Sequence, residues 1–184
     1  MRSTSVRHRS MQIARGRLSA AHAGLAAMSA VLAWEWTLSA SHKITSDFAG
    51  QFPTFIESSI GQGRPGVVND LLAHVVLRAP TVFALSVIAL DVALAAVFAA
   101  AAFALFVVAK GGLRLVAAAL AIAAATSLTF AVSLAVVNGD TVPWQLRGDA
   151  FESGVAVEYL LAGVSGAALI GAVMTVRRAR VSAS

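Results

Sequence analysis

The chain has 184 residues, of which 58% are hydrophobic and only 12% are charged, and its mean hydropathy is +0.79. An ordinary soluble domain carries about 25% charged residues, so this composition excludes a soluble globular protein and predicts an integral membrane protein. The length allows one bundle of spanning helices without a separate soluble catalytic domain. The sequence contains no cysteine, which excludes disulfides, thiol redox catalysis and iron–sulfur ligation by its own residues.

The net charge of +5 is concentrated at the two ends of the chain and does not form the patch that nucleic-acid binding requires. Five arginines precede the first apolar stretch within residues 1–17, and three follow the last one within residues 177–184. Basic clusters in these positions orient spanning helices and contact anionic lipid. We therefore expect basic cytoplasmic tails at 1–17 and 177–184, membrane lipid as a partner, and no nucleic acid.

Four apolar segments are long enough to cross a bilayer, for which about 17 residues suffice. They are residues 18–41, 81–109, 113–137 and 154–176. An even number of spans places both termini on one side, and that side carries ten Lys and Arg residues against four on the other. The positive-inside rule then predicts cytoplasmic termini and outer loops at 42–80 and 138–153. We expect a multi-pass protein of the bacterial plasma membrane.

A cleaved signal peptide is the competing interpretation of the first segment, because a basic stretch precedes an apolar run ending in Leu38-Ser39-Ala40. The apolar core of a signal peptide has about 7 to 15 residues. Since this run is longer and contains Glu35, the sequence favours a retained span.

The first outer loop is predicted to contain a short amphipathic helix. Apolar residues recur there at helical spacing: Val67, Val68, Leu71, Leu72, Val75 and Val76. Asp70 and His74 are left on a different face, so this helix should lie on the outer membrane surface or cap the bundle. The predicted fold class is therefore all-α: a four-helix transmembrane bundle over 18–176 with a short amphipathic helix in the first outer loop.

Small residues recur along the last span, where Gly163, Ala167 and Gly171 stand four residues apart. Such residues let helix backbones approach closely where lipid supplies no hydrophobic driving force. The pattern favours packing within the bundle over a homodimer interface, and a homo-oligomer stays open.

Three acidic residues interrupt the apolar segments at nearly the same distance from a basic end. The separations are 18 or 19 residues: Glu35 from Arg17, Asp91 from Lys110 and Glu158 from Arg177. At about 1.5 Å of rise per residue, the three carboxyls would occupy one layer roughly 27 to 29 Å from that end. A carboxyl at the centre of a spanning helix costs about 2.5 to 3.5 kcal/mol, so three at one depth predict a functional layer in the outer leaflet.

The three acids differ in how readily a structural role explains them. Asp91 has no charged neighbour in its own segment, so we expect it to be protonated or paired across the bundle with Lys43 or His42. Glu158 lies about one turn inside its segment, where a solvated rim position and a buried one fit equally well. Glu35 shares a helical face with His42 and Lys43, for which interface anchoring is as good an explanation as a functional role.

Trp36 directly follows Glu35, and an aromatic belt at the membrane interface explains it better than a ring stacked on a quinone. Histidines with carboxylate or histidine partners at ligand spacing are missing from the sequence, so no metal site is expected.

Short motifs resemble the DoxX/DoxD-like membrane proteins. They are Trp36-Thr-Leu-Ser-Ala-Ser-His-Lys43 followed by Phe48, then Ala89-Leu90-Asp91, Leu113-Arg114-Leu115 and Glu158. The chain departs from that family at Ala40, where Gly is common, at Asp91, which replaces Glu, and in the early first span, which lacks an Arg. The resemblance covers roughly residues 18–176. It implies a four-helix bundle whose polar pocket is lined by Lys43, Asp91 and Glu158, and a relationship to the membrane subunit of a thiosulfate:quinone oxidoreductase.

Two functions from different classes follow. In the first, the chain is the membrane subunit of an oxidoreductase complex with a soluble or membrane redox partner. The candidate catalytic acids are then Glu35, Asp91 and Glu158, and a quinone is the candidate cofactor, bound by His42, Lys43 and Trp36.

In the second, the polar layer is a structural clamp in a non-catalytic scaffold or accessory subunit. A transporter is disfavoured, because four spans without broken helices rarely enclose an alternating-access path.

Overall fold

A computed structural model of the chain describes residues 3–61, 65–107, 112–138 and 157–181. Within these residues the chain is all-α and contains no strand, as predicted. The α-helices are α1 (Ser3–Thr45), α2 (Phe48–Ser59), α3 (Gly66–His74), α4 (Pro80–Val107), α5 (Leu113–Asn138) and α6 (Val157–Val181), and a 3-10 turn, η1 (Val76–Arg78), follows α3.

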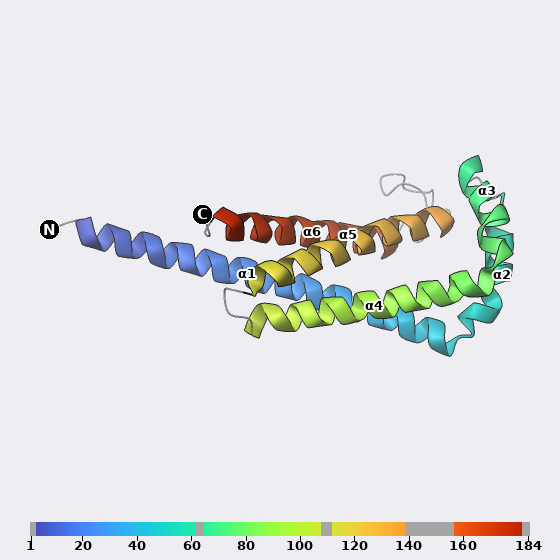
Figure 1. Cartoon of the computed structure of the whole chain (residues 1–184), viewed down its shortest axis with the longest axis horizontal. Helices are drawn as coiled ribbons and strands as arrows, with labels where there is room; N and C mark the ends of the chain where they lie inside the picture. The colour runs from blue at the N-terminus through green and yellow to red at the C-terminus, as the bar shows by residue number, and fades with distance from the viewer. Residues whose placement is uncertain (1–2, 62–64, 108–111, 139–156, 182–184) are drawn as a thin grey trace, which may run out of the picture.

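The four long helices α1, α4, α5 and α6 run side by side along the long axis of the molecule (Figure 1). The beginning of α1 and the end of α6 lie at one end of this bundle, and α2 and α3 cross the opposite end (Figure 1). The most extensive contacts join α1 to α4 and α5 to α6, while α4 with α5 and α1 with α6 complete the bundle more sparsely. The bundle therefore consists of two tightly packed helix pairs.

Three of the helices described are long and apolar enough to cross a membrane: Pro80–Val107, Leu113–Val137 and Glu158–Arg178. They correspond to the predicted spans 81–109, 113–137 and 154–176, of which residues 108–109 and 154–156 lie outside the described part of the chain. By length and composition, these three helices agree with the multi-pass membrane protein that the sequence predicts.

The predicted first span, 18–41, lies within α1 and packs along α4, but it is not among these three apolar helices of the described residues. Glu35, two tryptophans and several serines interrupt its apolar residues and lower its hydropathy.

The predicted amphipathic helix of the first outer loop is confirmed as α3, and a further helix, α2, precedes it. α2 and η1 contact α4, and Leu72 of α3 joins Phe52, Ile56, Val76 and Ala84 in one buried cluster at this end of the bundle. The apolar residues of α2 recur every four positions, which is a helical signal, but Pro53 stands inside the helix and obscured it. One face of α3, with Val68 and Leu72, therefore packs into the apolar cluster at the end of the bundle.

The connection between α1 and α2 is a tight turn at Asp47, whose φ of 51° lies in the left-handed region. Aspartate tolerates this conformation better than most residues. Gly50 leaves room for its carboxylate, since a Cβ there would lie 2.5 Å from Asp47 Oδ2.

Candidate functional site

An ion pair joins α1 to α4 inside the bundle. Lys43 Nζ lies 2.6 Å from Asp91 Oδ2, and Ser39 Oγ donates to the same oxygen at 2.8 Å. Lys43 Nζ also donates to Ser39 Oγ at 2.5 Å. The Asp91 side chain is fully buried and that of Lys43 is 15% exposed. The prediction that Asp91 pairs across the bundle with Lys43 or His42 is therefore confirmed for Lys43.

Local helix geometry explains this convergence. Ser39 and Lys43 stand one turn apart on α1, so their side chains reach α4 from the same face. The Lys43 ammonium also lies 5.7 Å from the centroid of the Phe48 ring at the start of α2, within the range of a cation–π contact. Both donors meet at Oδ2, and Asp91 Oδ1 has no hydrogen-bond partner among the residues described.

A second buried polar contact links α1 to α5 and α6. Trp36 Nε1 donates to Ser127 Oγ at 3.0 Å, and the hydroxyls of Ser127 and Ser165 lie 2.8 Å apart. The Trp36 ring stacks on Phe130 with a centroid distance of 5.5 Å. Ser127 thus links three helices, since its hydroxyl bonds to Trp36 of α1 and to Ser165 of α6.

The interpretation of Trp36 as an interface-belt residue is wrong, because its side chain is only 1% exposed and its N–H bonds inside the bundle. A buried tryptophan needs a partner for this donor, and Ser127 supplies it. The same burial leaves Trp36 committed to packing and not free to stack on a cofactor. The sequence did not predict this hydrogen bond, because Ser127 stands in α5 without a charged residue nearby.

The remaining candidate residues take no part in the ion pair. Glu35 is half-buried, Glu158 is half-buried in the first turn of α6, and His42 is exposed. An acidic residue in a helix's first turn is favoured by the helix dipole, which gives Glu158 a structural explanation.

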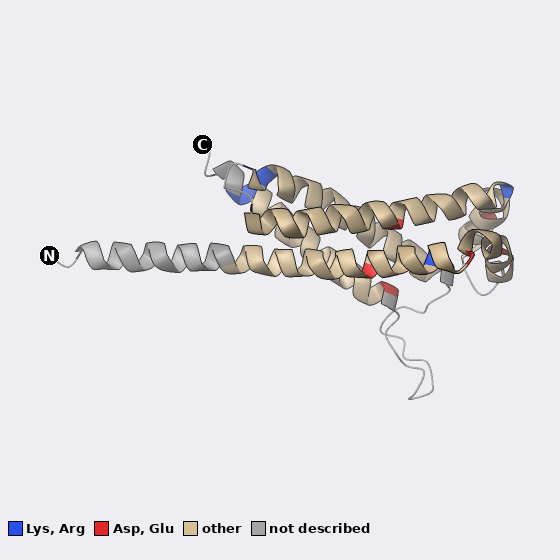
Figure 2. Ribbon diagram, turned by 90° about the horizontal axis from the view of Figure 1, so that it is seen from below, with Lys and Arg blue, Asp and Glu red and all other residues tan. Residues whose placement is uncertain are grey.

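The acidic positions of the long helices lie at similar points along the long axis of the bundle (Figure 2). This arrangement agrees with the predicted layer. The carboxyls do not converge, however, because no group of three His, Asp or Glu side chains in the described residues is close enough to hold a metal ion. The structure therefore brings Lys43 and Asp91 together and leaves Glu35 and Glu158 outside that cluster.

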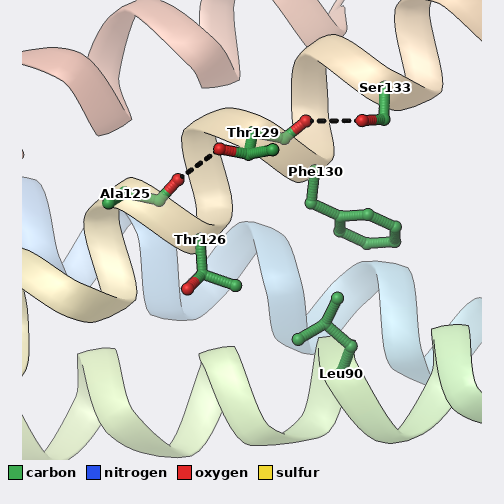
Figure 3. Close-up of a pocket in the computed structure, with 6 residues that line it drawn as sticks. All are labelled: Leu90, Ala125, Thr126, Thr129, Phe130 and Ser133. Atoms are coloured by element: carbon green, nitrogen blue, oxygen red, sulfur yellow. Dashed lines mark hydrogen bonds between the residues drawn. The ribbon is translucent and has the colours of Figure 1, made fainter.

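A groove of about 440 Å³ lies between α4 and α5. Its lining residues are Leu90, Ala125, Thr126, Thr129, Phe130 and Ser133 (Figure 3). This groove was not predicted from the sequence, although Thr126, Thr129 and Ser133 recur at the spacing of one helical face on α5. The groove touches the buried polar contacts through Phe130, which stacks on Trp36.

In the part of the chain that the structure describes, these features define a helical bundle with an apolar core, buried polar contacts between its helices and an open groove lined partly by hydroxyl groups. Comparison of the chain with protein-family models, with curated proteins and with solved structures finds no match. The resemblance to DoxX/DoxD-like proteins stays a prediction from short motifs.

Proposed function

We propose that this chain is a four-span protein of the bacterial plasma membrane, with both termini in the cytoplasm, that serves as a non-catalytic scaffold or accessory subunit of a membrane complex. The observation that supports this role is the burial and hydrogen bonding of Asp91. Its side chain is fully buried and accepts hydrogen bonds from Lys43 and Ser39. A carboxylate held in this way stabilises the helix pair α1/α4 and is not presented to a substrate.

The packing of α1 supports its role as the fourth span. Leu25, Leu32 and Trp36 are buried in the core of the bundle, and the polar side chains of Ser39 and Lys43 are directed at α4. Polar residues in spanning helices face the bundle interior and pair there. A less apolar helix is therefore accommodated in the membrane when its polar residues have partners inside the bundle.

The test is a charge-free variant. Lys43→Met combined with Asp91→Leu replaces the two charged side chains by apolar side chains of similar length. We expect this variant, extracted in mild detergent, to migrate in the same native-gel complex as the wild-type chain. If a variant that still folds loses the complex, the two charges have a role beyond joining α1 to α4.

A second candidate, the membrane subunit of a quinone-linked oxidoreductase, is favoured by the groove between α4 and α5. The groove includes Leu90, the neighbour of Asp91, and Phe130, which contacts Trp36. In this case a redox protein is the partner and a quinone head enters from the bilayer. Binding of a quinone analogue that weakens in a Glu35→Gln, Asp91→Asn variant would favour this function, and equal binding by variant and wild type would favour the scaffold.

A further inference from the structure

We infer that the outward face of α1 binds a spanning helix of another membrane protein, and that this helix carries a lysine or arginine at the depth of Glu35. Such a helix belongs to the complex in which we propose that the chain is a scaffold, so the inference rests on that proposed function. The feature that points to this partner is Glu35, a carboxyl group without a partner among the described residues.

Glu35 lies deep along the bundle. Ser39, one helical turn from Glu35 on α1, donates to Asp91 Oδ2, and Asp91 stands eleven positions after Pro80, where α4 begins. At about 1.5 Å of rise per residue, Asp91 is roughly 16 Å from that end of α4, which is about half the hydrocarbon thickness of a bilayer. The acidic positions of the long helices lie at similar points along the long axis (Figure 2). If α1 and α4 span the bilayer as proposed, hydrocarbon surrounds the Glu35 carboxyl wherever the protein does not cover it.

The bundle leaves this carboxyl unsatisfied. Glu35 is partly exposed, and it makes no hydrogen bond or ion pair with the residues that the structure describes. Lys43 of the same helix is held by Asp91 at 2.6 Å. Acidic residues inside a membrane are costly, and they pair with other groups there. A cation that pairs with Glu35 therefore comes from another helix.

The surface beside Glu35 has the repeat of a helix-packing face. Exposed residues of α1 alternate at spacings of three and four positions, and they define its outward face: Gly24, Ala27, Val31, Trp34, Leu38 and Ser41. This spacing is that of a left-handed coiled coil. A Cβ at Gly24 would meet nothing within 4 Å, so the described bundle does not cover that end of the face. Glu35 follows Trp34 and stands at the edge of the repeat, where charged residues pair with the facing helix and select it.

The charge of Glu35 decides between the possible occupants of this face. Lipid tails cover its apolar side chains but offer the carboxyl no partner. Two copies of the chain packed in parallel by this face would bring two Glu35 side chains to one depth, where like charges repel. Apart from Lys43, every Lys and Arg of the sequence stands at the end of an apolar segment or outside these segments. A different protein with a basic residue inside its spanning helix is therefore the complementary partner.

The probes that test this contact are synthetic helices of about 20 leucine and alanine residues, a length that spans a bilayer. They differ at one central position, which carries lysine, leucine or glutamate. The full chain is labelled at Ser5→Cys, since its own sequence contains no cysteine. Energy transfer to each labelled helix is measured in phosphatidylcholine vesicles, with unlabelled helix as the competitor. We expect saturable binding of the lysine helix and at least about tenfold weaker binding of the other two.

Matched variants locate the contact. Glu35→Gln should lower the affinity for the lysine helix about tenfold. Glu35→Lys should instead select the glutamate helix, a reversal that a merely structural role of Glu35 would not produce. Ala27→Trp should block the outward face, whereas Ala119→Trp, at an exposed position of α5, should leave binding unchanged. Thermal unfolding in detergent confirms that each variant folds.

Three results would overturn the inference. Equal binding of the three helices by the wild-type chain would mean that the carboxyl selects nothing. Wild-type affinity in Glu35→Gln would mean that the lysine of the probe pairs elsewhere. Wild-type affinity in Ala27→Trp would mean that the probe docks on another face of the bundle.

The native-gel complex separates this contact from the scaffold role. If Glu35→Gln keeps the complex and the wild-type chain does not discriminate among the three helices, the scaffold role stands and the contact at Glu35 is removed. If the wild-type chain migrates alone in the native gel and still selects the lysine helix, the contact stands and the scaffold role is removed.

Discussion

At Asp91, one carboxylate oxygen accepts the hydrogen bonds from Ser39 and Lys43, and the other has no partner among the described residues. The charge is therefore stabilised mainly from one side, by Lys43 with help from Ser39. Burying a carboxylate and an ammonium removes much of their hydration, so the pair is stable only while both partners are present. We therefore expect the loss of one partner to destabilise the protein more than the replacement of both partners by apolar residues.

Lys43→Met alone should destabilise the protein by about 3 to 5 kcal/mol, because it leaves an uncompensated buried carboxylate. Adding Asp91→Leu should recover much of that loss, because the remaining side chains are apolar. The measurement is unfolding by dodecyl sulfate titration in mixed micelles, arranged as a double-mutant cycle. His42→Met is the control, since His42 is the exposed neighbour of Lys43, and strict additivity of the two main changes would mean that the pair contributes no coupling.

Ser127 has a different role, because its hydroxyl is bonded to two other side chains, Trp36 and Ser165. Ser127→Ala leaves the buried indole N–H without an acceptor and should cost about 1 to 3 kcal/mol. Ser165→Ala should cost less, because Ser127 keeps its hydrogen bond from Trp36. The same titration ranks the two variants, and a greater loss for Ser165→Ala would show that the indole finds another acceptor.

At the scale of helices, the later spans were predictable because long apolar runs have few alternatives. Pro80 starts α4 at the position where proline is favoured in a first helical turn. The pairing of Asp91 with Lys43 was also predictable, because depth in a bilayer limits which charges meet. Trp36 was misassigned because sequence gives the depth of an aromatic residue but not the direction in which it faces.

The groove escaped prediction for a related reason. Serines and threonines in spanning helices bond to their own backbone and attract little notice singly. A groove arises from how far apart two helices pack, here α4 and α5, and that distance is set by the whole bundle.

The helix α3 has a second apolar face that does not contact the bundle. Val67, Leu71 and Val75 stand at successive turns and are exposed, Val67 by 74% and Leu71 by 53%. The helix crosses the end of the bundle at a steep angle to the long helices (Figure 1). An apolar face on a helix in this orientation is placed to insert into the boundary between headgroups and acyl chains.

A spin label tests this placement, and the cysteine-free sequence makes a single introduced cysteine unique. In reconstituted vesicles, a label at Leu71→Cys should be accessible to oxygen dissolved in the lipid and protected from a water-soluble nickel chelate. A label at Asp70→Cys, on the neighbouring exposed polar position, should show the opposite. Equal access of the chelate to both labels would mean that α3 stands in water.

For the whole molecule, the buried polar contacts match the division into helix pairs. Lys43 and Asp91 tie α1 to α4, and Ser127 and Ser165 tie α5 to α6. Trp36 connects the two pairs, since it stands on α1 and bonds to α5. The arrangement packs α1 alongside the apolar helices α4 and α6, even though its own hydropathy is lower.

The last prediction follows from this position of α1. If α1 crosses the membrane, reporter fusions after Ser5, Gly111 and Ser182 should report the cytoplasm, and fusions after Ile60 and Gln145 should report the outside. Only the crossing of α1 places Ser5 and Ile60 on opposite sides, so this pair of fusions separates a four-span chain from one in which only α4, α5 and α6 cross. The expected result rests on the buried Lys43–Asp91 pair, because a helix lying outside the bilayer would have to leave Asp91 unpaired inside it. The same side for both fusions would remove the fourth span, and with it the account of why a carboxylate is tolerated in α4.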